Sequence, residues 1–355
     1  MQAPQLFIPF SVHQSIGGPT TFIQNLQRYL DSVDFPYCQK LKHADGIFFP
    51  VEFSLRGLNR VKQNGGTIIQ RLDGIFYPEK HGAAYQEYNA LLKTIYQEYA
   101  DFVIFQSEYS RQQCFALLGK KAKQRWTIIR NGADKSIFFP AQKPCLCIDD
   151  PVQFVSTGNF RNHDMLEPVI RALDSLHGTF EFHLTLVGPI TNPELEVYTK
   201  RDYITYAGSK AAPEIAEILR NSHIFLYSHL NPPCPNSVIE AVSCGLPVVG
   251  FRSGAMAELC SFSEELLADV SDAVFQRYAD FDARQLTSKI AMAVDRYGHY
   301  KTLALSQSHL YDFQRCGAQY VTVFQHCLRK NMGVIARIKR LIKKILAKIP
   351  AGSSG

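Results

Sequence analysis

The 355-residue sequence has no apolar run close to the roughly 20 residues that a membrane-spanning helix needs. Its first ten residues also lack a basic segment followed by a long apolar run, so we predict no signal peptide. The nine cysteines include no Cys-x-x-Cys pair, and Cys145-x-Cys147 has no second pair or histidine cluster beside it. We therefore expect reduced thiols, a cytoplasmic location, no metal and no bound cofactor.

Acidic residues are missing from residues 329–355, which hold eight basic ones. Removing those eight from the 38 Lys and Arg residues leaves 30 against 32 acidic residues, so the body is slightly acidic although the net charge is +6. A nucleic-acid-binding body would carry a basic stripe over its fold, so we predict no nucleic-acid partner.

Within that basic end, residues 333–349 place apolar side chains at helical spacing opposite a face of Lys and Arg only. This pattern is typical of an amphipathic helix on anionic lipid, and it predicts a peripheral position on the inner face of the cytoplasmic membrane. The alternative is that the apolar stripe packs on the body and the charges are solvated.

The length and the 46% hydrophobic content indicate two globular domains. Short apolar runs alternate with amphipathic stretches, which predicts an α/β protein with two Rossmann-like, doubly wound parallel sheets facing a cleft. The proline-rich stretch 141–151 is the expected linker and hinge. The predicted parts are an acceptor-side domain, the linker, a donor-binding domain, a closing helix and a basic tail, at 1–140, 141–151, 152–310, 311–330 and 331–355.

The expected elements follow from the same alternation. Strands are predicted at 6–10, 46–51, 67–71, 102–106, 126–129, 153–157, 181–187, 203–206, 224–227 and 247–251. Helices are predicted at 20–30, 85–99, 110–118, 165–176, 213–221, 237–244, 283–296 and 311–328.

The most specific pattern lies in residues 224–250. An apolar strand is followed by a proline-rich loop and by Asn236 or Ser237 as the cap of a helix. The first-turn amides of such a helix lack intrahelical partners and carry the positive end of its dipole, so they suit a diphosphate. Glu240 lies one turn further on the same side, where a carboxylate can accept hydrogen bonds from a ribose diol. Taken alone, the segment could also be a capped helix with an exposed glutamate.

The full run Pro-Asn-Ser-Val-Ile-Glu-Ala-Val-Ser-Cys-Gly-Leu-Pro-Val-Val-Gly closely resembles the donor-site segment of the family 4 glycosyltransferases, which have the GT-B fold. Three further segments resemble the family in the expected order. Gly17–Phe22 is similar to its glycine loop, Ala100–Arg111 to a strand and helix start, and Asn131–Asp134 to the crossing into its second domain. The likeness covers roughly residues 5–325.

The resemblance implies a hexosyltransferase that moves a sugar from a nucleotide-diphosphate sugar to a cell-envelope glycan or glycolipid, as in lipopolysaccharide synthesis. It also implies retention of anomeric configuration, without a metal. In the family the matching glutamate binds the ribose, and the helix amides face the phosphates. The predicted donor-binding residues are Gly17, Gly18, Asn131, Gly158, Arg161, His163, Asn236, Ser237, Val238 and Glu240.

The sequence departs from the family in both domains. The first glutamate of the family's Glu-x7-Glu pair, which contacts the transferred sugar, is Pro232 here, so backbone groups of 231–234 are the replacement we consider. After Gly158 the family has an arginine and a lysine. This chain offers Arg161 as the phosphate clamp, with His163 assisting if protonated.

In the first domain, no histidine matches the one that often ends a strand in the family. Arg71 and Asp73 lie at the end of that strand and are the acceptor-side candidates, so the predicted catalytic residues are Arg161, Asp73 and Arg71. Two other functions stay open. One is a nucleotide-sugar epimerase or hydrolase of the same architecture, and the other is a non-catalytic sugar-nucleotide-binding subunit.

Overall fold

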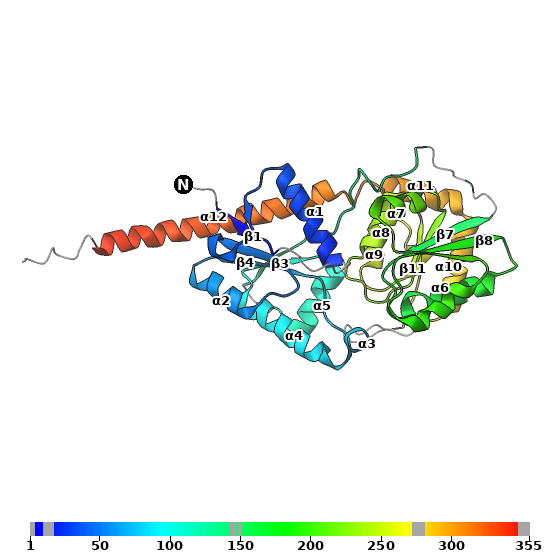
Figure 1. Ribbon diagram of the computed structural model, residues 1–355, viewed down its shortest axis with the longest axis horizontal. Coiled ribbons are helices and arrows are strands. Elements are labelled where there is room, and N and C mark those ends of the chain that lie inside the picture. Colours follow the sequence, from blue (N-terminus) through cyan, green and yellow to red (C-terminus); the bar gives the residue numbers. More distant parts are fainter. Residues whose placement is uncertain are drawn as a thin grey trace, which may run out of the picture.

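A computed structural model of the chain describes residues 4–9, 18–121, 123–142, 147, 151–271 and 281–346, and the backbone alone for residues 18, 19, 43, 80 and 330–346. The described residues form two six-stranded sheets, which lie in two lobes along the long axis of the molecule (Figure 1). Every strand pair in both sheets is parallel. The predicted α/β class with two doubly wound sheets is confirmed.

The first domain has the strand order β2-β1-β3-β4-β5-β6. Its central strands read as continuous apolar runs because both faces of a parallel sheet are covered by helices. Its strands are β1 (Leu6–Phe7), β2 (Tyr37–Cys38), β3 (Gly46–Pro50), β4 (Thr67–Leu72), β5 (Phe102–Phe105) and β6 (Arg125–Ile128). Its helices are α1 (Gly18–Ser32), α2 (Leu55–Gln63), α3 (Pro78–His81), α4 (Tyr85–Thr94), the π-helical η3 (Ile95–Tyr99) and α5 (Glu108–Leu118).

The second domain has the order β12-β11-β10-β7-β8-β9. Its strands are β7 (Val152–Thr157), β8 (Phe182–Val187), β9 (Ile204–Gly208), β10 (Ile224–Tyr227), β11 (Val248–Phe251) and β12 (Leu267–Ala268). Its helices are α6 (Glu167–Leu176), the 3-10 helix η5 (Pro193–Lys200), α7 (Ala212–Arg220), α8 (Asn236–Ser243), α9 (Met256–Leu259), α10 (Ala283–Asp295) and α11 (Tyr297–Gln307).

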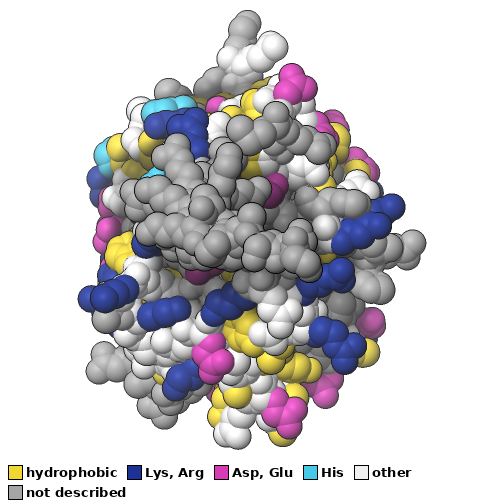
Figure 2. All heavy atoms as spheres, turned by 90° about the vertical axis from the view of Figure 1, so that its left-hand side faces the viewer, with side chains coloured by type: hydrophobic (Ala, Val, Ile, Leu, Met, Phe, Trp, Pro, Cys, Tyr) yellow, Lys and Arg dark blue, Asp and Glu magenta, His cyan; other side chains and the backbone are white. Residues whose placement is uncertain are grey.

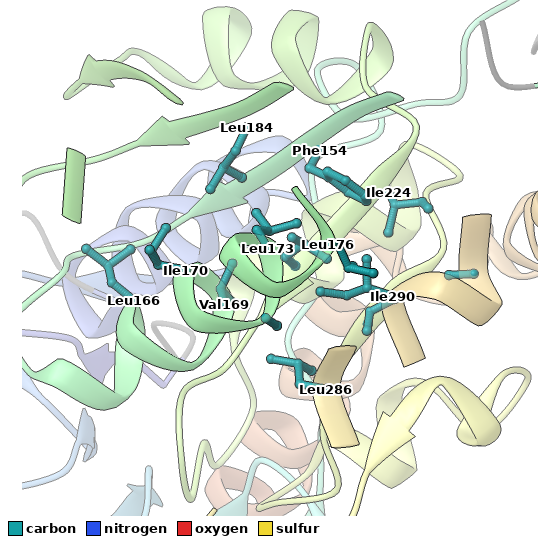
Figure 3. Close-up of a cluster of buried hydrophobic side chains, with 14 of the residues drawn as sticks. Phe154, Leu166, Val169, Ile170, Leu173, Leu176, Leu184, Ile224, Leu286 and Ile290 are labelled. Atoms are coloured by element: carbon teal, nitrogen blue, oxygen red, sulfur yellow. The ribbon is translucent and has the colours of Figure 1, made fainter. Parts of the chain in front are cut away.

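The largest core cluster lies in the second domain between its sheet and helices α6 and α10 (Figure 3). Leu173 and Ile170 of α6 and Ile290 of α10 are fully buried there with Phe154 and Leu184 of the sheet. Burying a large apolar side chain contributes about 1.5–3 kcal/mol. This core holds the carboxyl ends of β7 and β10 in fixed register.

The last helix, α12 (Phe313–Leu346), returns to the first domain and covers its sheet. The Phe324 ring packs on the Phe48 ring at 5.0 Å, and the Tyr320 ring packs on the Phe22 ring at 5.1 Å. The helix then continues well beyond the body (Figure 1). The closing helix and the start of the basic tail, which the sequence presents as separate parts, are therefore one continuous helix.

The chain passes between the domains at two adjacent points. The Ala133 amide donates to the Tyr311 carbonyl at 2.8 Å, and the Phe313 amide donates to the Ala133 carbonyl at 3.0 Å. A Cβ on Gly132 would lie 2.7 Å from the Phe313 Cα, so only glycine allows the two segments to lie this close. Phe138 already belongs to the core of the second domain. The chain thus crosses between the domains before the expected linker 141–151, and the hinge and the domain bounds stay predictions.

None of the described helices is both long and apolar enough to span a bilayer. The cysteines that the structure describes form no disulfide.

Candidate active site

The strand order of the second sheet reverses between β7 and β10, and ligands of doubly wound folds bind outside the carboxyl ends of the strands at such a point. Gly158 directly follows β7, and His229 follows β10. A Cβ on Gly158 would meet the His229 ring at 3.2 Å, and a Cβ on Gly188 would lie 1.8 Å from the Gly158 carbonyl oxygen. Glycine at these two positions therefore lets the segments that follow the strands pack closely against one another at this edge.

Helix α8 begins at the same edge. It starts at Asn236 with Pro235 in the capping position and no side-chain cap, so the expected capping by Asn236 or Ser237 is wrong. Pro235 already fixes the backbone, and the Asn236 side chain bonds elsewhere. No described residue accepts from the amides of Asn236, Ser237 and Val238. All three lie at the positive end of the helix dipole, where Asn236 and Ser237 are partly exposed and Val238 is fully buried.

Glu240 lies partly buried one turn into α8. Burial raises the pKa of its carboxyl to about 8, because no cation in the described residues compensates the desolvation. Within that part of the chain no hydrogen bond to this carboxylate is found. A ribose diol would supply the missing donors.

The two basic candidates differ in their surroundings. Arg161 is exposed, and its amide donates to the Met165 sulfur at 3.3 Å, so its guanidinium can reach toward a ligand. His163 is held by the Tyr198 hydroxyl at 3.1 Å and by a Glu194 oxygen at 3.3 Å. Its contacts on η5 favour a structural role for His163 over a phosphate contact.

On the acceptor side, Arg71 and Asp73 end β4 as predicted, but Arg71 is only 1% exposed. Its Nε lies 2.8 Å from the Asp73 Oδ1, and its guanidinium stacks 3.6 Å from the centroid of the Phe22 ring. Burial raises the pKa of the Asp73 carboxyl, and Arg71 and Gln106 oppose that shift. Asp73 is the more accessible of the two, at 16% exposure, so Arg71 is better placed to orient it than to touch an acceptor.

Asn131 joins the two halves of the site. Its side-chain oxygen accepts from Arg71 Nη2 at 3.2 Å. Its side-chain amide donates to Gln106 at 2.9 Å, to the Cys234 carbonyl at 3.1 Å and to Asn236 Oδ1 at 2.8 Å. The predicted donor-site residue Asn131 is therefore buried between the domains and connects the end of β4 with the first residue of α8.

The loop 228–235 lacks the family's first glutamate, and its backbone is largely committed to the protein itself. The Asn231 amide donates to Ser253 Oγ at 2.8 Å, the Pro232 carbonyl accepts from the Ala255 amide at 2.8 Å, and the Cys234 carbonyl accepts from Asn131. Few of the groups that we considered as replacements are left to hold a sugar.

Gly17 lies outside the described residues, and Gly18 is the first residue of α1. No cluster of His, Cys, Asp and Glu in the described ranges could hold a metal ion.

The sequence reading missed Glu258, Tyr109 and His229. Glu258 accepts hydrogen bonds from the first domain, as described below. His229 packs its ring 4.4 Å from the Tyr227 ring at the switch point. The available signal was positional, since both Glu258 and His229 follow closely after strands of the second sheet.

Known proteins are similar to this chain in sequence and in fold. Residues 151–280 match the sequence model of a family described as Glycosyl transferases group 1. No curated protein sequence matches the chain at a significant level.

Among solved structures, sucrose-phosphate synthase from Thermosynechococcus elongatus aligns with a TM-score of 0.73 at 14% identity, over 93% of this chain and 100% of that one. Anabaena HepE, in complex with UDP-glucose, aligns with 0.67 at 14%, over 91% and 99%. WaaG, a glycosyltransferase involved in lipopolysaccharide biosynthesis, aligns with 0.66 at 12%, over 90% and 99%. At these identities the likeness shows the fold.

The fold and the family match together define a glycosyltransferase of GT-B architecture. The match to the model of group 1 glycosyltransferases covers residues 151–280, in agreement with the resemblance to family 4.

Proposed function

We propose that the protein transfers a hexose from a nucleotide-diphosphate sugar to a glycan or lipid-linked acceptor of the cell envelope, with retention and without a metal. The observation that carries the proposal is the pairing, on α8, of three unpartnered first-turn amides with the unpartnered carboxylate of Glu240. The amides suit a diphosphate and the carboxylate suits a ribose. HepE was solved with UDP-glucose, which makes that donor the first to test.

The residues of the chain supply charge stabilisation for the leaving diphosphate. The amides of Asn236, Ser237 and Val238 and the guanidinium of Arg161 would hold its negative charge. Asp73, oriented by Arg71, is the acceptor-side carboxylate that faces the transferred sugar.

Membrane attachment is the second part of the proposal. Helix α12 projects from the first domain, and Lys and Arg side chains lie on both sides of the end from which it emerges (Figure 2). A cytoplasmic protein held on the inner face of the membrane in this way would meet a lipid-linked acceptor directly.

The test is nucleotide binding followed by turnover. Calorimetry with UDP, GDP and ADP should show one preferred nucleotide, and Glu240→Ala and Arg161→Ala should each weaken its binding about tenfold or more. Turnover of the matching sugar donor, with the product anomer assigned by NMR, then tests transfer and retention. If no nucleoside diphosphate binds, or if the two variants bind as tightly as the unmodified protein, the proposed site is wrong.

A non-catalytic sugar-nucleotide-binding subunit is the second candidate, because Pro232 replaces the family's sugar-contacting glutamate. Tight nucleotide binding with no transfer or hydrolysis of any sugar donor would favour this function.

A further inference from the structure

The first turn of α5, in the first domain, finds two of its hydrogen-bond acceptors in the second domain. The Ser110 amide donates to Ser107 Oγ at 3.0 Å, which is a local cap. The amides of Glu108 and Tyr109 instead donate to the two carboxylate oxygens of Glu258, at 3.0 and 2.7 Å. Because first-turn amides have no intrahelical partners, Glu258 completes the cap of a helix that belongs to the other domain.

A third hydrogen-bond donor reaches the same carboxylate. Arg130 Nη2, close to the first crossing between the domains, lies 3.2 Å from a Glu258 oxygen. The carboxylate thus faces a guanidinium and the positive end of the α5 dipole, and charge-assisted hydrogen bonds of this kind are stronger than neutral ones.

The Glu258 carboxylate can also be solvated when these hydrogen bonds are broken. Its side chain is 21% exposed and borders a cavity of about 370 Å³ beside the double crossing between the domains, which Arg130 and Arg315 also line. Water in this cavity could solvate the carboxylate if the domains separated. The contact is therefore specific to the closed arrangement without trapping the charge there.

Tyr109 links this contact to the sugar-nucleotide site. Its hydroxyl donates to Asn231 Oδ1 at 3.0 Å. Asn231 is buried in the loop 228–235 and has a φ of 54°, a conformation that needs support from its surroundings. The residue whose amide bonds to Glu258 thus also holds the loop that precedes α8.

We propose that Glu258 is a positioning residue that latches the two domains in the closed arrangement and, through Tyr109 and Asn231, fixes the loop 228–235 beside the donor. The effect on transfer rests on the proposed function, whereas the latch itself does not. In an open arrangement the Glu108 and Tyr109 amides would face water, and the loop would lose its contact with the first domain.

Hydrogen exchange of the full-length protein without substrate tests the latch. In Glu258→Ala we expect the amides of residues 108 and 109 to exchange about tenfold faster, with the strands of both sheets unchanged. Small-angle scattering should show a larger radius of gyration for this variant. Glu264→Ala is the matched control, because Glu264 pairs with Arg252 inside the second domain and should change neither measurement. Unchanged exchange in the first turn of α5 would refute the latch, even if no sugar donor is ever turned over.

A second variant separates the latch from its effect on the loop. Tyr109→Phe keeps the amide that bonds to Glu258 and removes the hydroxyl that bonds to Asn231. The same hydroxyl also has longer contacts, of 3.3 and 3.4 Å, with Gln113 and Tyr77 inside the first domain. We expect normal exchange of the α5 amides, normal affinity for the nucleotide alone and a roughly tenfold lower kcat/KM for the sugar donor. A kcat/KM equal to that of the unmodified protein would show that Tyr109 does not position the loop.

Discussion

Asn131 donates its side-chain amide to the side chain of Asn236, 105 residues away in the other domain, at 2.8 Å. The first of these residues lies where the chain leaves the first sheet, and the second is the first residue of α8. This hydrogen bond fixes the phosphate-facing turn of one domain against the strand ends of the other.

Asn131→Ala should therefore lower both stability and turnover. It takes the Asn131 donor away from the buried acceptors on Gln106 and Cys234 and removes one of the partners of the buried Arg71 guanidinium, which costs about 1–3 kcal/mol in the free energy of unfolding. Because α8 is also displaced, we expect kcat/KM to fall about tenfold or more. Urea denaturation and steady-state kinetics measure the two effects, with the exposed Asn64→Ala as a control. A variant with the stability and kinetics of that control would contradict the role of Asn131.

Glu240→Gln should change how stability depends on pH. Burial raises the pKa of this carboxyl to about 8 from its ordinary value of 4.5, so between these values the folded chain holds one proton more than the unfolded chain. The stability that this proton provides is complete below about pH 4.5 and is lost as the pH rises through about 8, by at most about 1.4 kcal/mol per pH unit. Denaturation at several pH values should show this loss in the unmodified protein and not in the variant. Parallel profiles would disprove the assignment.

Anionic lipid binding should depend on the basic face of the tail. Replacing Lys339, Arg340, Lys343 and Lys344 with glutamine removes about 1 kcal/mol per charge, so affinity for anionic vesicles should fall on the order of 100-fold or more. Vesicle flotation of the full-length protein measures this. The same number of substitutions in the second domain, at Arg171, Lys200, Lys210 and Arg284, is the matched control. An equal loss of vesicle affinity in both variants would show that the net charge of the protein, and not the tail, determines lipid binding.

At position 51 we expect a glycine variant to be more stable than an alanine variant, which is the reverse of the usual order. Val51 follows β3 with a φ of 60°, which costs a residue with a Cβ about 1–2 kcal/mol. Elsewhere in a strand or helix, glycine is less stable than alanine by about 0.5–1 kcal/mol. We expect Val51→Gly to be more stable than Val51→Ala by about 1 kcal/mol. Thermal unfolding of the two variants measures this difference, and a more stable alanine variant would contradict the prediction.

The fold could be predicted because its signals are local. Strands such as Ile224–Tyr227 are uninterrupted apolar runs between turn residues, and the structure has that strand at the predicted residues. The short edge strands β2 and β12 were missed because each has only two residues, too few to show a period. Helix α2 was missed because it has only nine residues, of which only Leu58 and Val61 are buried, so its apolar side chains recur too few times to show a period.

Residues of the candidate site could be predicted only where their role follows from their position on a single strand or helix. Gly158, Asn236 and Glu240 lie at the ends of strands or on the first turns of a helix, and their places in the fold agree with that expectation. The partners of Asn131, Arg71 and Glu258 could not be predicted, because they depend on how two domains meet. No periodicity within one segment carries that information.

Helix α12 begins at the double crossing between the domains and lies against the first sheet for its initial turns before it leaves the body. If its far end is held on a membrane, the acceptor-side domain stays fixed relative to the membrane and the second domain moves when the two domains open. Each cycle of opening would then carry the spent nucleotide away from the bilayer toward the cytoplasm. The lipid-linked acceptor and the surface that receives it would stay in place.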